Sequence, residues 1–186
     1  MRVFILSLLI LPALAGAAEL RSVNVDTVDG HYLMRSEVWF AVGVEQLYAV
    51  MLDYDLGTQF SSVIVDSRNI DPDEYGRPQF FTRHKACILF FCMNFERYGH
   101  VEFERHVSIS ATADPETSDF HVSREVWQFR QEGEGTVLIY DVDLKPKFWM
   151  PPVIGPFILK HKLVNDGSRA IHRIEAIAQA WPDLVD

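Results

Sequence analysis

Helical spacing of apolar residues occurs twice in this chain, on either side of a long stretch of strand signals. Residues 44–54 have helical spacing, residues 63–147 carry strand signals, and residues 154–180 return to helical spacing. This order predicts a strongly curved antiparallel sheet closed by one terminal helix, with a hollow between them. We expect function inside that hollow, because a concave space lined by apolar side chains is typical of ligand sites.

The individual elements follow from periodicity and from turn residues. A first strand is expected over 31–40, because apolar and polar side chains alternate there. The helix at 44–54 and a short helical turn near 56–60 come next. Further strands are expected at 63–70, 78–87, 93–103, 106–113, 120–130 and 136–147. The predicted fold class is therefore α+β, with about seven strands and one or two short helices after the first strand.

Residues 1–18 are predicted to be a secretory signal peptide. Arg2 gives a positive start, residues 3–15 are mostly apolar, and small residues follow. The alternative, a membrane anchor, is disfavoured because it needs about 20 apolar residues. We expect cleavage after Ala17 or Ala18, with cleavage after Ala15 as an alternative. A single domain over 19–186 would then be periplasmic or secreted.

The acidic composition excludes several partners. The chain has 17 Lys and Arg against 26 Asp and Glu, a net charge of −9. A protein this acidic, without a basic cluster, repels phosphate backbones, so nucleic acid is a poor partner. No phosphate-binding loop and no metal-binding motif of the usual Cys and His spacings is present, so we expect neither a metal nor a cofactor.

The two cysteines, Cys87 and Cys92, bracket the apolar segment Ile88-Leu89-Phe90-Phe91. Along a continuous strand they would lie about 16 Å apart, too far for a disulfide. A bond therefore requires the chain to reverse between them, and export favours that bond. The alternative is a continuous buried strand with two free thiols. If the segment is an exposed hairpin tip, Ile88, Leu89, Phe90 and Phe91 could make transient contact with a membrane.

The order of motifs resembles the START-like, helix-grip superfamily (SRPBCC), which includes coenzyme Q-binding proteins, polyketide cyclases and the birch-pollen-allergen lipid carriers. The marks are an acidic-aromatic end to the first helix at Asp53-Tyr54, Trp127-Gln128-Phe129 before a Gly turn, Val142-Asp143-Leu144 after it, and the long closing helix. The resemblance covers nearly all of residues 30–180. The Cys-bracketed insertion and the export signal are departures from relatives of the coenzyme Q type.

Aromatic side chains are abundant on the strands and the helix that would bound the hollow. They suit a flat or long apolar ligand such as a lipid, quinone or sterol. The candidate ligand-binding residues are Phe81, Tyr98, Trp127, Phe129, Phe148, Trp149, Phe157, His161 and Val164. His161 interrupts the apolar stripe of the last helix, and the alternative for it is a structural histidine.

Glu125 is a candidate acid–base group, because it shares a strand face with Ser123, Trp127 and Phe129. Apolar surroundings would raise the pKa of its carboxyl group. The alternative is a carboxylate at the mouth of the hollow or one satisfied by a nearby arginine. His161 is the other acid–base candidate.

Three functions remain open from the sequence. The first is an exported carrier of a hydrophobic small molecule. The second is a cyclase or dehydratase that uses Glu125 or His161, since several relatives of this fold catalyse such reactions. The third is an envelope protein-interaction module whose contact is the apolar tip. We rank them in that order, so an enzyme is less expected than a binding protein.

Overall fold

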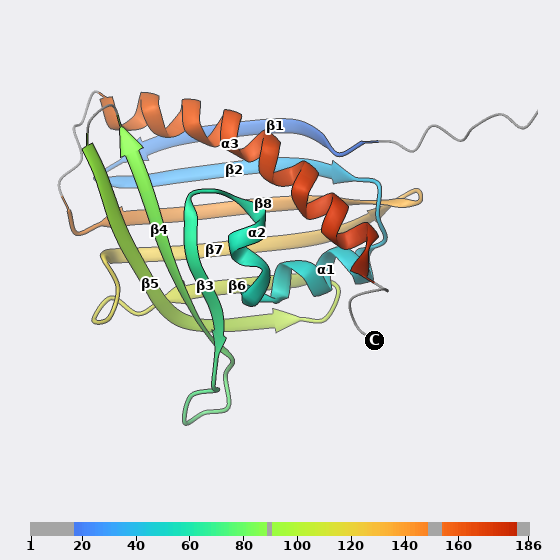
Figure 1. Ribbon diagram of the computed structural model, residues 1–186, viewed down its shortest axis with the longest axis horizontal. Helices are drawn as coiled ribbons and strands as arrows, with labels where there is room; N and C mark the ends of the chain where they lie inside the picture. The colour runs from blue at the N-terminus through green and yellow to red at the C-terminus, as the bar shows by residue number, and fades with distance from the viewer. Residues whose placement is uncertain (1–16, 89–90, 149–153, 182–186) are drawn as a thin grey trace, which may run out of the picture.

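The computed structural model describes residues 17–88, 91–148 and 154–181. Eight strands in this part form one antiparallel sheet in the order β1-β2-β8-β7-β6-β5-β4-β3. The strands are β1 (Glu19–Val28), β2 (His31–Phe40), β3 (Ile64–Ile70), β4 (Gln79–Ile88), β5 (Phe91–Glu104), β6 (Ser108–Ala113), β7 (Phe120–Glu132) and β8 (Gly135–Pro146). The sheet curls, and the helices lie on its concave, inner face (Figure 1).

Four helical segments complete the described part of the chain. They are α1 (Val44–Leu52), the 3-10 helix η1 (Tyr54–Leu56), α2 (Gly57–Phe60) and α3 (Ile154–Gln179). The long helix α3 crosses the inner face diagonally and passes beside α1 and α2 (Figure 1). No helix in the described ranges has both the length and the apolar content that a bilayer-spanning segment needs.

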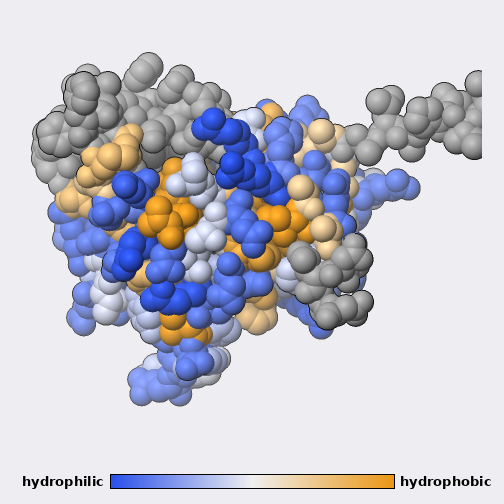
Figure 2. Space-filling view, viewed as in Figure 1, coloured by the Kyte–Doolittle hydropathy of each residue, from blue (hydrophilic) through white to orange (hydrophobic). Residues whose placement is uncertain are grey.

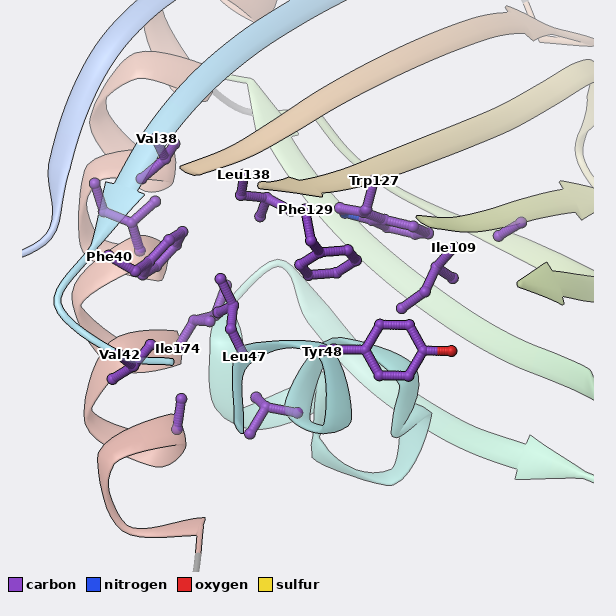
Figure 3. Close-up of a cluster of buried hydrophobic side chains, with 14 of the residues drawn as sticks. Val38, Phe40, Val42, Leu47, Tyr48, Ile109, Trp127, Phe129, Leu138 and Ile174 are labelled. Carbon is purple, nitrogen blue, oxygen red and sulfur yellow. The ribbon is translucent and has the colours of Figure 1, made fainter. Parts of the chain in front are cut away.

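The hydrophobic core lies where α1 and the C-terminal part of α3 meet the inner face. Phe40 and Leu47 are fully buried, and Phe129 and Ile174 pack into the same cluster (Figure 3). Helix α1 contributes its buried face to this cluster, as its helical spacing predicts. This end of the concave side is therefore filled by side chains.

The predicted α+β helix-grip architecture is confirmed, with two differences. The sheet has eight strands rather than about seven, because Glu19–Val28 forms an additional strand, β1, at one edge. The short helices consequently follow the second strand instead of the first. Most residues of β1 are exposed, so the alternation of apolar and polar residues that predicts a strand is weak there.

The predicted disulfide between Cys87 and Cys92 is confirmed. The two residues are directly opposite each other in the antiparallel pairing of β4 with β5. The chain therefore reverses between them, as the bond requires. Leu89 and Phe90 lie outside the described residues, as do the side chains of Ile88 and Phe91.

Candidate functional site

The inner face of β7 carries both polar and aromatic side chains. Ser123, Trp127 and Phe129 are buried, and Glu125, which has the same parity along the strand, is largely covered. The neighbouring strands add Tyr140 from β8 and Arg97 from β5. We call Arg97, Ser123, Glu125, Tyr140 and Tyr54 of η1 the polar cluster.

Arg97 is the centre of the polar cluster, because its guanidinium reaches two residues of β7. Nε donates to Ser123 Oγ at 2.8 Å, and Nη1 donates to Glu125 Oε1 at 2.9 Å. The guanidinium also lies over the ring of Phe80, 5.5 Å from its centroid. Arg97 is only 4% exposed, so a permanent positive charge is held inside the sheet beside one carboxylate.

Two polar atoms of the cluster remain without partners. Arg97 Nη2 and the Tyr54 hydroxyl are both buried, and neither has a hydrogen-bond partner among the described residues. Tyr54 stacks on Phe80 with ring centroids 4.7 Å apart, so both unpartnered groups flank the same ring. Buried donors are almost always satisfied in folded proteins. Each of these two groups can therefore donate a hydrogen bond to a polar atom of a ligand or to a water molecule.

Four ionisable groups of this region have pKa values shifted away from neutrality, namely those of Tyr54, Tyr140, Arg97 and His84. Burial raises the pKa of the Tyr54 and Tyr140 hydroxyls, and the nearby Glu125 carboxylate raises both further. Burial lowers the pKa of Arg97, but the charge of Glu125, its hydrogen bond and the two tyrosines together outweigh burial, and the net shift is upward. Burial, and then the charge of Arg97, lowers the pKa of His84 to about 3. At neutral pH the tyrosines and His84 are therefore neutral and Arg97 is charged.

Aromatic rings surround the polar cluster on two sides. Trp127 stacks on Tyr140 with centroids 5.3 Å apart. Towards the disulfide end of the sheet, His84 stacks on Phe95 at 5.0 Å, and Phe95 contacts both Phe120 and Phe148. The arrangement combines a charged donor with extensive apolar surface, which is the composition expected of a site for an amphipathic small molecule.

The structure places the predicted ligand-binding residues in three locations. Trp127 and Phe129 lie on the inner face, and Phe148 packs against Phe95 and Phe120. Trp149 lies outside the described residues, and so do the side chains of Phe157, His161 and Val164. Phe81 and Tyr98 face each other on the outer face, so including them was wrong.

The outward orientation of Phe81 follows from strand alternation. Phe80 is fully buried in the core, so its neighbour Phe81 points the other way. The ring of Phe81 is covered by Arg68, whose guanidinium lies 4.1 Å from the ring centroid. Tyr98 donates a hydrogen bond to Gln79 on the same outer side. Neither ring can reach the polar cluster.

Glu125 lies where the sequence predicts, on the inner face, but it is paired with Arg97. This is one of the alternatives given for it above, a carboxylate satisfied by an arginine. Arg97 was not among the predicted site residues, although the sequence indicates that it points inwards. Arg97 has the same parity along the strand as Val101, a buried apolar residue, and an arginine at an inward position is unusual.

A groove of about 360 Å³ lies on the other side of the sheet. Its walls include Arg35, Arg124 and Asp141 from the outer faces of β2, β7 and β8. Arg35 and Asp141 pair with each other at 2.8 Å, and both are solvent-accessible. The groove is open and its Arg35 and Asp141 are paired with each other, whereas the polar cluster holds a buried donor that has no partner among the described residues. We therefore place the candidate site on the inner face.

Comparison with solved structures identifies the same fold in several proteins. A START superfamily protein from Mycobacterium smegmatis matches with a TM-score of 0.64 and 18% identity, over 80% of this chain and 99% of that one. A STAR-related lipid transfer protein from Xanthomonas axonopodis matches with a TM-score of 0.64 and 12% identity, over 86% and 99%. The Zhui aromatase/cyclase from a Streptomyces species matches at 0.59 and 11%, over 81% and 94%.

At these identities the similarity concerns the fold, which is START-like and helix-grip. No family model matches the chain, and no curated protein matches it.

Proposed function

We propose that this protein is an exported binding or carrier protein for a hydrophobic small molecule with one polar end, of the lipid, quinone or sterol class. The observation that carries the proposal is Arg97, a buried cation on an aromatic-lined inner face whose Nη2 amino group has no hydrogen-bond partner among the described residues. The fold supports it, since proteins named as lipid transfer proteins and aromatase/cyclases share it. The ligand would lie between the inner face and α3.

The two parts of such a ligand have different roles. Removal of about 300 Å² of apolar ligand surface from water is worth roughly 7 kcal/mol before entropy losses, which suffices for binding without covalent chemistry. An oxygen atom at the polar end would accept a hydrogen bond from Arg97 Nη2. Because that donor is charged and buried, the bond discriminates against ligands that lack an acceptor there.

The test begins with the mature protein as it is purified. Its bound lipids are extracted and identified by mass spectrometry, and binding of a fluorescent fatty acid and of a quinone is measured by titration. We expect a co-purified amphipathic molecule or binding of at least one probe. Absence of both would contradict the proposal.

A substitution pair then tests the role of Arg97. Arg97→Lys keeps a positive charge beside Glu125 but replaces the planar guanidinium by a single ammonium nitrogen, so the separate Nη2 donor is lost. Arg83→Lys makes the same change in the exposed pair of Arg83 with Glu96. We expect R97K to weaken probe binding about 10-fold or more, and R83K to leave it unchanged. Equal binding by both variants would exclude Arg97 from ligand recognition.

A cyclase or dehydratase is less well supported. A general acid or base works best with a pKa near the operating pH. Among the described groups around the candidate site, the shifts of Tyr54, Tyr140, Arg97 and His84 all lead away from neutrality. The remaining candidate, Glu125, is ion-paired. These features favour binding over proton transfer.

Export and membrane contact are parts of the proposal that rest on the sequence. The predicted N-terminal signal peptide supports a periplasmic or secreted location, and the bonded cysteines fit an oxidising compartment. The apolar segment between the cysteines supports transient membrane contact during loading. Co-sedimentation with phosphatidylcholine vesicles tests this contact, and we expect Phe90→Ser to reduce it.

A further inference from the structure

Glu175 is a buried acidic residue on α3 that contacts the beginning of the folded chain. Glu175 is only 6% exposed. Oε2 accepts a hydrogen bond from the backbone N–H of Ala18 at 2.9 Å, and Oε1 accepts one from the backbone N–H of Ala41 at 2.8 Å. The carboxylate thus joins α3 to the start of β1 and to the segment between β2 and α1.

The partners of Glu175 are unusual for a buried carboxylate. Both hydrogen bonds come from neutral backbone groups, and no lysine, arginine or histidine of the described residues forms an ion pair with it. Burial of a carboxylate is costly unless a positive charge compensates it. In the part of the unprocessed chain that the structure describes, no positive charge compensates this carboxylate.

Ala18 marks a boundary in both the sequence and the structure. It is 7% exposed and belongs to the core cluster, whereas Ala17 is exposed. Residues 15–17 read Ala-Gly-Ala, which is the Ala-x-Ala pattern that precedes a signal peptide cleavage site. Hydrolysis of the Ala17–Ala18 bond would consume one water molecule, leave a carboxylate on Ala17 and create an α-amino group on Ala18.

We propose that the signal peptide is cleaved between Ala17 and Ala18, and that the new N-terminal ammonium group of Ala18 forms a buried ion pair with Glu175. The donor atom already lies at hydrogen-bond distance from the carboxylate, so no rearrangement is required. Processing thereby supplies the missing positive charge and fastens α3 to β1. The inference rests on the export part of the proposed function.

The other cleavage positions do not have this consequence. Cleavage after Ala18 removes the residue whose nitrogen contacts Glu175. Cleavage after Ala15 places the ammonium group on Gly16, two residues before the contact. The structure therefore distinguishes among the three cleavage sites that the sequence leaves open.

The cleavage site is tested by expression of the full chain, with its own leader, in a bacterial host that exports proteins. The intact mass of the exported product identifies its first residue. We expect Ala18. A product that starts at Gly16 or Glu19 would overturn this inference and leave export standing, whereas a chain that stays unprocessed in the cytoplasm would overturn both.

The ion pair is tested by thermal unfolding of mature chains that differ only in their first residue. All described strands and helices follow Ala17, so each of these chains contains the complete fold. We compare a chain that starts at Ala18, the same chain with an acetylated N-terminus, and a chain that starts at Ala17. We expect the free Ala18 terminus to raise the melting temperature by about 5–10 °C over the other two.

Substitution of Glu175 tests whether its carboxylate is the partner of the N-terminal ammonium group. In Glu175→Gln the three chains should melt within about 1–2 °C of one another, whereas the control Glu19→Gln, on an exposed residue beside the terminus, should preserve the difference. Equal melting of the three chains with Glu175 intact would overturn the inference without any substitution. Probe binding by the same chains reports separately on the proposed function.

Discussion

Arg97 and Glu125 form an ion pair at which the loss of one partner is costly. Their side chains are 5% and 12% exposed. Arg97→Met would leave the Glu125 carboxylate covered and unpaired, and we expect a loss of about 3–5 kcal/mol of unfolding free energy. Arg83→Met removes the arginine of an exposed pair whose side chains are both 44% exposed, so about 0–1 kcal/mol is expected. Urea unfolding of both variants measures the difference, and similar losses would show that Arg97 is not structurally coupled to Glu125.

His84 makes the stability of the protein dependent on acidity. Its pKa is about 3 in the folded chain, because burial and then Arg97 disfavour the charged ring. The ordinary pKa of histidine is about 6.5, so below that pH the unfolded chain binds a proton that the folded chain does not. Stability from this group is therefore present above about pH 6.5 and is lost as the pH falls towards 3, by at most about 1.4 kcal/mol per pH unit.

The variant His84→Gln isolates this contribution. We expect its unfolding free energy to fall less steeply between pH 6.5 and 4.5, by up to roughly 1 kcal/mol per pH unit, although the lost stacking on Phe95 destabilises it at every pH. His121→Gln, on an exposed residue of β7, is the control and should keep the slope of the unsubstituted protein. Identical slopes in the unsubstituted protein and H84Q would contradict the assignment.

At the scale of elements, two glycines have opposite roles. A Cβ atom on Gly99 of β5 would overlap the backbone carbonyl oxygen of Thr112 on β6. The strands could accommodate it only by moving apart, so Gly99→Ala should destabilise the protein by about 1–3 kcal/mol. Gly167 in α3 has open space around the same position, and Gly167→Ala should stabilise it by up to about 1 kcal/mol. Opposite shifts of the urea midpoint are the expected result, and shifts of the same sign would contradict it.

The elements that sequence patterns predict well are those with one buried face. The apolar spacing of α1 and the alternation of β2 correspond to buried positions, and both were predicted. Strand β1 is an edge strand whose residues are mostly accessible, so burial imposed little alternation. The sequence nevertheless contains a turn signal between β1 and β2. Asp29 and Gly30 both have positive φ angles, 51° and 79°, as a two-residue hairpin turn requires.

The sequence could not predict which side chains line the site, because strand register, and not amino-acid composition, decides which face each residue occupies. Of the adjacent phenylalanines in β4, Phe80 faces the core and Phe81 faces outwards, and a shift of one residue exchanges them. Apolarity alone cannot choose between two identical neighbours. The pairing of Arg97 with Glu125 joins residues 28 apart through β5 and β7, which are not adjacent in the sheet. Such a contact depends on sheet curvature, which a local pattern does not contain.

At the scale of the whole molecule, the concave side has two regions of different composition. At one end, α1 and the C-terminal part of α3 are packed against Phe40 and Phe129 (Figure 3). Further along the sheet, the polar cluster combines buried charge with donors that have no partner in the part of the chain that the structure describes. The surface on this side alternates between hydrophobic and hydrophilic patches (Figure 2). Stability from packing is therefore concentrated at the first region, and the second has polar groups that a ligand can satisfy.

This division predicts that a ligand stabilises the whole molecule through the region around Arg97. A ligand at 100 times its Kd adds about 2.7 kcal/mol, equivalent to about 5–10 °C in melting temperature for a chain of this size. We expect delipidated protein to melt lower than protein reloaded with its co-purified molecule by this amount. R97K should lose most of the shift and R83K should keep it. A reloaded protein that melts at the temperature of the delipidated one, although the ligand is bound, would show that the unfolded chain binds the ligand as tightly as the folded one and would contradict a site that depends on the fold.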